Sequence, residues 1–326
     1  MDLGNSFKMS LNFVLMLTLC VSIAGCGPSS GAQVADPDAL RGTITVSGAW
    51  ALYPLMVRWG EEFQKLHPDV RFDISAGGAG KGMADALAGA VDIGMVSREI
   101  YPEELEKGAF WVSVTKDAVF PTISTENPAL EQLLQQGVSR EIFIGIFITG
   151  EITTWGQVVN QPSMTEPIHV FTRSDACGAA DTWAKYLDAD QEDLLGVAVY
   201  GDPGLLEAVI KDPLGIGFNN LNYAFDMDTG EPVAGARVIP VDVDGDGSVS
   251  TDEIYSAKSQ AVAAVASGRY PSPPARDLNL VTRGQPTGLA KAFITWVLSD
   301  GQNYVGEAGY ISLSEEVLAK QMEKLD

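Results

Sequence analysis

Three parts of the chain repeat one pattern, a short apolar strand, a loop of small residues and an amphipathic helix, and this pattern restricts the fold more than any other feature. The strands of the three units are predicted at residues 43–47, 70–74 and 168–172, and a further strand at 91–96 leads into Ser97-Arg98. The helix after the first strand carries its apolar residues at spacings of three and four, as Leu52, Leu55, Met56, Trp59, Phe63 and Leu66. Strands that alternate with helices predict an α/β fold with largely parallel sheets.

The loops in these units have the composition of anion sites. A helix start has unpaired backbone N–H groups and a partial positive charge, and small residues let an anion approach them. Arg98 and Arg173 stand beside two of the segments and could each offer a planar donor fork. The alternative is that the glycines only make tight turns and the arginines pair with surface carboxylates. The loop at 77–82 lacks the spacing and the hydroxyl residue of a P-loop, so a nucleotide site is not expected.

The N-terminus has the features of an export signal. Residues 9–25 are uncharged and follow Lys8, and the run ends in Ile23-Ala24-Gly25-Cys26, which resembles the cleavage and lipidation site of bacterial lipoproteins. We therefore predict a signal peptide at 1–25, a lipid on Cys26 and a flexible tether at 26–41. The protein is then expected outside the cytoplasmic membrane and anchored to it. An uncleaved anchor helix and ordinary secretion are the alternatives.

Charge and composition exclude several classes of partner and site. The chain has 43 acidic and 21 basic side chains and a formal net charge of −22. So acidic a surface repels nucleic acid, so no nucleic-acid partner is expected, and any anion must be held by local groups. Two histidines and three cysteines are too few for a zinc cluster of several ligands or a disulfide framework.

Residues 242–253 match the calcium-binding loop of an EF-hand at every required position. The predicted ligands are the side chains of Asp242, Asp244 and Asp246, the carbonyl of Ser248, a water on Ser250 and both oxygens of Glu253. The preceding residues 238–241 are predicted to be extended and residues 253–266 to form the exiting helix. We predict one structural calcium ion; the alternative is an acidic turn without an ion.

Phrases spread in order along the chain resemble those of the phosphate-type substrate-binding proteins of ABC transporters, in the periplasmic-binding-protein superfamily. They are Ser47-Gly48 to Tyr53-Pro54-Leu55 with Trp59 and Phe63, Gly78-Ala79-Gly80, Asp92-Ile93-Gly94 with Ser97-Arg98, Ile146 to Trp155, Arg173 with Cys177-Gly178, Gly215 to Phe218, Gly268 to Pro271, and Trp296 to Leu298. The phrase from Ile146 to Trp155 is quite specific to this group.

The resemblance implies a two-lobed periplasmic-binding-protein-like α/β fold with two hinge crossings. By analogy, residues 42–121 and 237–326, including the calcium loop, form lobe 1, and residues 122–236 form lobe 2. A small inorganic or organic oxyanion would bind in the cleft, and the closed form would dock on a membrane permease. The implied ligand-binding residues are Gly48, Ala49, Trp50, Ala51, Gly77, Gly78, Ser97, Arg98, Arg173, Cys177, Gly178 and Ala179.

The chain departs from the family at its hydroxyl donors, because Ala49, Ala51, Gly77, Cys177 and Ala179 occupy those positions. Each lost hydrogen bond to a charged ligand weakens binding by about 1.5 to 3 kcal/mol. Phosphate and a different, larger anion therefore both remain possible ligands. A role as a sensor or as a calcium-dependent scaffold also remains possible.

An enzyme is the third class considered. Cys177 would be the nucleophile and His169 or His67 its base. The first histidine lies on a predicted strand that ends before the loop, and the second lies beside a helix stop, so no catalytic residue is predicted.

Overall fold

The computed structural model of the protein describes residues 39–326. The predicted signal peptide, Cys26 and residues 26–38 of the predicted tether lie outside the described residues. Within the described part, no helix has both the length and the apolar content needed to cross a bilayer.

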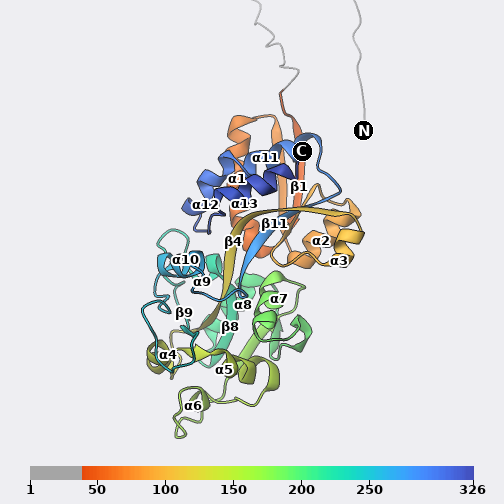
Figure 1. Cartoon of the computed structure of the whole chain (residues 1–326). Helices are drawn as coiled ribbons and strands as arrows, with labels where there is room; N and C mark the ends of the chain where they lie inside the picture. The colour runs from red at the N-terminus through yellow and green to blue at the C-terminus, as the bar shows by residue number, and fades with distance from the viewer. Residues whose placement is uncertain (1–38) are drawn as a thin grey trace, which may run out of the picture. The chain divides into compact units, whose positions relative to one another are not determined.

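Two strands, β4 (Ala109–Ser124) and β11 (Ala275–Arg283), run side by side through the middle of the described part and connect two lobes (Figure 1). They pair antiparallel, from Ala109 with Arg283 to Ala118 with Ala275. Within residues 39–326, nine strands form one sheet in the order β2-β1-β3-β11-β4-β8-β6-β7, with β9 paired to β4. The two predicted hinge crossings are therefore the points where β4 and β11 pass between the lobes.

The first lobe is an α/β unit in which β1 pairs parallel with both β2 and β3. Its further elements are β1 (Gly42–Gly48), η1 (Trp50–Leu52), α1 (Tyr53–Leu66), β2 (Val70–Ala76), α2 (Ala79–Ala88), β3 (Ile93–Val96), α3 (Pro102–Glu106), α11 (Gly288–Val297), η4 (Asp300–Gln302), α12 (Asn303–Glu307) and α13 (Glu315–Glu323).

The second lobe repeats this plan, with β6 parallel to β7 and β8. Its elements are α4 (Leu130–Gln136), β5 (Val138–Ser139), α5 (Arg140–Ile144), the π-helical turn η2 (Gly145–Thr149), α6 (Trp155–Val158), β6 (His169–Arg173), α7 (Gly178–Tyr186), η3 (Gln191–Asp193), β7 (Val197–Val199), α8 (Gly201–Lys211), β8 (Gly215–Asn220), α9 (Leu221–Ala224), β9 (Ala236–Val238), β10 (Val241–Asp242) and α10 (Lys258–Ala266).

The core of the first lobe is built on the predicted apolar face of α1. Leu55, Met56, Trp59 and Phe63 are buried, and Phe63 packs edge-on against Phe293 of α11 with ring centroids 5.2 Å apart. Leu66, the last residue of the helix, is 59% exposed, so its predicted place on the buried face is wrong. The helix ends there because a residue before proline is disfavoured in helical conformation, and His67 precedes Pro68.

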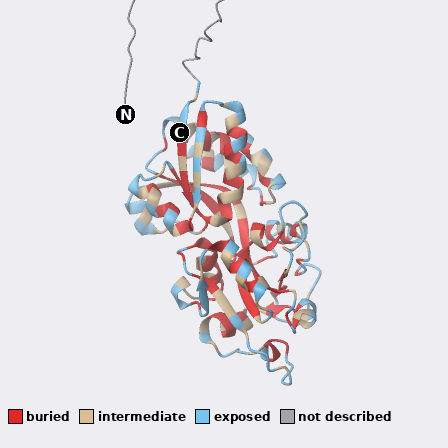
Figure 2. Cartoon of the chain, turned by 180° about the vertical axis from the view of Figure 1, so that it is seen from behind, coloured by how far each residue is buried: buried red, intermediate tan, exposed pale blue. Residues whose placement is uncertain are grey.

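The second lobe has its own buried cluster, and Figure 2 shows buried residues along the strands of both lobes. This cluster includes Ile239, Tyr255, Ala264 and Tyr270, so residues 237–275 pack in the second lobe and not, as predicted, in the first. The physical reason is long-range pairing, because β10 joins β5 of this lobe in parallel. The exiting helix after the calcium loop, predicted from residue 253, begins only at Lys258.

Candidate functional site

The loops that follow β1, β2 and β6 meet between the two lobes. The amides of Gly77 and Gly78 donate hydrogen bonds to the carbonyl of Gly48, at 2.9 and 3.0 Å. The amide of Gly80 donates across the lobes to the carbonyl of Ala176, at 3.0 Å. The structure therefore brings together the three small-residue loops that the sequence analysis singled out.

Gly178 starts α7 directly opposite Ser97 of the first lobe. A Cβ atom at position 178 would lie 2.1 Å from the carbonyl oxygen of Ser97, so the approach requires glycine. The amides of Gly178 and Ala179 are the first of the helix and have no acceptor within it. This helix start thus combines an anion-attracting end with close contact between the lobes.

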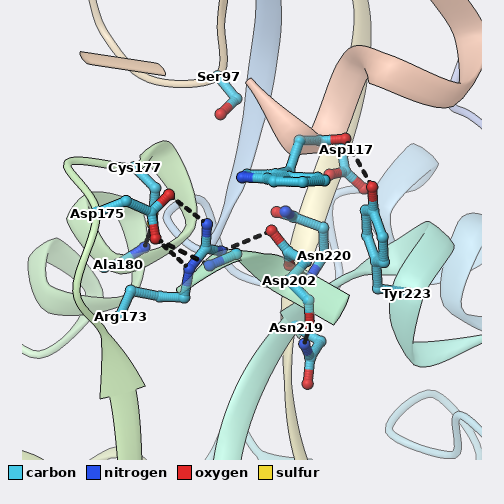
Figure 3. Close-up of polar contacts among 12 residues, drawn as sticks. Ser97, Asp117, Arg173, Asp175, Cys177, Ala180, Asp202, Asn219, Asn220 and Tyr223 are labelled. Atoms are coloured by element: carbon cyan, nitrogen blue, oxygen red, sulfur yellow. Dashed lines mark hydrogen bonds and ion pairs between the residues drawn. The ribbon is translucent and has the colours of Figure 1, made fainter. Parts of the chain in front are cut away.

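Arg173, at the end of β6, points inward, and its side chain is fully buried. Its Nε and Nη2 donate to the two oxygens of Asp175, at 2.8 and 2.6 Å, and its Nη1 donates to Asp202 at 2.6 Å (Figure 3). Burial acts to lower the pKa of Arg173, but the Asp202 and Asp175 carboxylates outweigh it and raise that pKa. The guanidinium is therefore in the interlobe site, but two carboxylates already contact it.

Arg98 does not present an open donor fork. Its Nη1 and Nη2 donate to the two oxygens of Glu104, at 3.0 and 2.6 Å, and its guanidinium stacks on Tyr101 at 4.2 Å from the ring centroid. The predicted role of Arg98 as an anion ligand therefore lacks support from its geometry, which is that of a structural ion pair.

Trp50 extends from the first lobe to the second. A Cβ at Gly201 would lie 3.2 Å from its ring, and the Tyr200 ring lies edge-on to it at 6.2 Å. The hydroxyl of Tyr223 donates to its carbonyl at 3.4 Å. The flanking Ala49 and Ala51 are buried. Trp50 thus forms one wall of the interlobe site.

Cys177 caps α7, because its sulfur accepts a hydrogen bond from the amide of Ala180 at 3.4 Å. Burial raises the pKa of Cys177 to about 12, which disfavours a thiolate. His169 instead pairs with Asp212 at 2.7 Å, and His67 packs on Phe63. The observed contacts give the thiol no base.

Three buried acids and a second arginine complete the site without having been predicted. They are Asp117 on β4, Asp175 in the third loop, Asp202 on α8 and Arg276 on β11. Asp175 could have been inferred from its place two residues after Arg173. The other three lie in strands or a helix far apart in sequence, and no local pattern marks them.

The predicted calcium loop brings its first three acids together, with one carboxylate oxygen of each of Asp242, Asp244 and Asp246 within 4.8 Å of the others. Asp242 accepts hydrogen bonds from the amides of Gly245, Asp246 and Gly247 at 2.8 to 3.2 Å. Such a converging set of hard oxygen ligands suits calcium.

The last predicted ligand, Glu253, is 6% exposed and accepts from the amides of Val243 and Ser250 at 2.7 and 2.9 Å. The hydroxyl of Ser248 donates to a carboxylate oxygen of Asp246. This bond does not involve the backbone carbonyl of Ser248, which is the predicted calcium ligand. The loop is joined to the second lobe through the amide of Val249, which donates to the carbonyl of Gln135.

Comparisons with known proteins agree with this architecture. The family described as PBP superfamily domain matches residues 33–301. The phosphate-binding protein PstS of Bacillus subtilis is 25% identical over 311 residues, which cover 93% of each chain. That of Methanocaldococcus jannaschii is 27% identical over 374 aligned positions, covering 96% of this chain and 94% of the relative.

Two solved structures share the fold. A phosphate ABC transporter substrate-binding protein of Clostridium perfringens, with bound phosphate, has a TM-score of 0.68 and 23% identity over 84% of this chain and 100% of its own. A phosphate transport receptor of Vibrio cholerae has a TM-score of 0.60 and 19% identity over 83% of this chain and 100% of its own. The predicted periplasmic-binding-protein-like fold is confirmed.

Proposed function

Because this chain belongs to the family of PBP superfamily domains, we propose that it is the solute-binding component of an ABC importer and captures phosphate or a related oxyanion between its lobes. The observation that carries the proposal is the buried Arg173 near the start of α7, because this helix start lies directly against Ser97 of the first lobe. The relatives with full-length matches are named phosphate-binding proteins. Neither name is that of an enzyme, and no catalytic residue is predicted in this chain.

A melting-temperature panel tests this proposal. Phosphate, arsenate, sulfate, molybdate, tungstate and small organophosphates are added separately, because a ligand that binds only the folded state raises the midpoint. We expect at least one oxyanion to raise it, Arg173→Lys to reduce the shift and Arg173→Ala to abolish it. Arg71→Ala is the matched control, since that side chain lies on the surface and bonds backbone carbonyls next to it. A panel without any shift would reject the proposed function.

We further propose that the protein acts outside the cytoplasmic membrane, held there by a lipid on Cys26 and delivering its ligand to a permease. The sequence from residue 9 to Cys26 supports this. Cys26→Ser should prevent incorporation of a labelled fatty acid into the protein and release it from the membrane fraction. Continued labelling of that variant would contradict the proposed anchor.

We also propose that residues 242–253 bind one calcium ion that braces the second lobe. Asp242, Asp244, Asp246 and Glu253 would supply side-chain oxygens, with Ser248 and Ser250 completing the set as the motif predicts. Calcium should raise the melting temperature above that in chelator, and Asp242→Asn should remove the difference. Asp73→Asn, at an exposed position on β2, is the control. An effect of calcium without any effect of oxyanions in calcium-free buffer would favour the alternative, a calcium-braced scaffold or sensor.

A further inference from the structure

A chain of buried charged groups crosses the interface between the lobes. Arg173 bonds Asp202, and Asp202 accepts from the amide of Asn220 at 3.2 Å. The Asn220 side chain accepts from Nη2 of Arg276, which lies 3.5 Å from Asp117. Figure 3 shows Arg173, Asp202, Asn220 and Asp117 in succession.

Asp117 ends this chain with its hydrogen-bonding capacity unused. It is 1% exposed, and neither of its carboxylate oxygens has a hydrogen-bond partner among the described residues. Burial raises the pKa of Asp117, and the Arg276 guanidinium and the amides of Ala118 and Leu221 act to lower it. A buried carboxylate that has one long ion pair, to Arg276, and no hydrogen bond is costly, and such groups in native proteins call for an explanation.

Two donors of the same region also lack acceptors in the described part of the chain. They are Nε1 of Trp50 and Nη1 of Arg276. Tyr223 links this wall to the acid, because it bonds the carbonyl of Trp50 and lies next to Asp117 in Figure 3. Around the long ion pair of Arg276 and Asp117, the site therefore has both donors and an acceptor that lack hydrogen bonds, which suits a ligand that carries both signs of charge.

The charge balance favours the same class of ligand. The connected groups comprise three carboxylates, Asp117, Asp175 and Asp202, and two guanidinium groups, Arg173 and Arg276. Their formal sum is −1 when all are ionised. Lys258 lies outside this hydrogen-bonded chain, but the Asp117 carboxylate acts on it, because it raises the pKa of Lys258 against the effect of burial; counting this buried cation brings the formal sum to zero. At pH 7.5 a phosphate monoester adds a charge of about −2 to these groups, whereas an aminoalkyl phosphate, with its one ammonium group, adds only about −1.

We propose that the ligand of the interlobe site is an oxyanion that also bears a protonated amine, an aminoalkyl phosphate or phosphonate, with its ammonium group at Asp117. The anionic end lies toward Arg173 and the start of α7, so this inference rests on the proposed function. Trp50 then serves as a wall beside an organic ligand.

Calorimetry with two ligands of matched shape tests the proposal. Phosphoethanolamine and propyl phosphate differ in an ammonium group in place of a methyl group. We expect the wild-type protein at pH 7.5 to bind phosphoethanolamine at least about tenfold more tightly, the effect of one charged hydrogen bond. Asp117→Asn should bring the ratio close to one. Asp277→Asn is the control, because this half-exposed acid lies on the same strand pair and bonds Lys116, and it should keep the wild-type ratio.

The outcomes separate the two proposals. Equal affinity of the wild-type protein for both compounds would overturn the proposal that the ligand bears an amine, whatever the variants show. The proposed binding of an oxyanion would still stand. A preference for the amine that persists in Asp117→Asn would overturn the assignment to this residue. Failure of both compounds and of inorganic phosphate to bind would reject the proposed function itself.

Discussion

Asp117 gives the stability of this protein a distinct dependence on pH. Burial raises the pKa of Asp117 from 3.8 to about 6. Between these values the folded protein holds a proton that the unfolded chain has lost. The ionised Asp117 therefore lowers the free energy of unfolding above pH 6, and this loss becomes smaller as the pH falls below 6. This rise in the pKa of Asp117 changes the free energy of unfolding by about 3 kcal/mol at most.

We therefore expect Asp117→Asn to unfold at a higher denaturant concentration than the wild-type protein at pH 7.5. The difference should shrink toward pH 4.5, because the wild-type acid becomes neutral there. Denaturant titrations of both proteins at the two pH values measure it, and other carboxylates cancel in the comparison. A difference that stays constant with pH would show that Asp117 does not titrate as described.

Cys177 is expected to be unreactive in the folded protein. Its pKa of about 12 and its 4% exposure leave little thiolate and little access at pH 8. Alkylation followed by peptide mass spectrometry should show slow labelling of Cys177 in native protein and complete labelling in denaturant. Rapid native labelling would restore the enzymatic interpretation.

Single residues also show where sequence-based inference stops. Arg173 and Arg98 each stand beside a predicted loop and lie between the lobes, but Arg173 is fully buried near the start of α7, whereas Arg98 is paired with Glu104. The difference arises because Glu104, six residues after Arg98, accepts hydrogen bonds from both terminal nitrogens of the Arg98 guanidinium. Asp117 and Asp202 join the site only through the pairing of distant strands and helices. Such contacts depend on tertiary structure and leave no local pattern.

Among the elements, helix α7 offers a direct test of the lost hydroxyl donors. Serine caps helices well and adds a donor of the kind that the resembled family has at this position. Cys177→Ser should tighten phosphate binding by about tenfold, the effect of one hydrogen bond to a charged group. Cys177→Ala is the matched variant without a donor. Equal affinities in calorimetry would place the anion away from this helix start.

The calcium segment shows which features of an element are local and which are not. The motif identifies the loop from twelve residues, and Asp242, Asp244 and Asp246 converge as it predicts. Its lobe was predicted wrongly, because the deciding contacts are β10 with β5 and Val249 with Gln135, more than 90 residues apart along the chain. The helix begins later than predicted, because residues 254–257 are not helical and Ala257 occupies the N-cap position of α10.

At the scale of the whole molecule, the two-lobed α/β architecture follows from repeated local patterns and from the resemblance, and the comparisons confirm it. The exact crossing points do not, since they are set by the antiparallel pairing of two distant strands, β4 and β11. Several hydrogen bonds join the lobes: Gly80 bonds Ala176, and Arg276 of β11 bonds both Ser97 and Asn220. Closure is therefore sensitive to any atom added at these contacts.

Gly178→Ala should hold the lobes apart. The added methyl group would lie 2.1 Å from the carbonyl oxygen and 2.2 Å from the hydroxyl of Ser97, so the closed arrangement cannot form without movement of the backbone. Overpacking of about 1 to 3 kcal/mol lowers oxyanion affinity by roughly tenfold or more. Small-angle X-ray scattering should then give a larger radius of gyration than for the wild-type protein in saturating ligand. Gly306→Ala is the control, since a Cβ there meets no atom within 4 Å. If Gly178→Ala compacts with ligand as the wild type does, the contact between Ser97 and α7 does not limit closure.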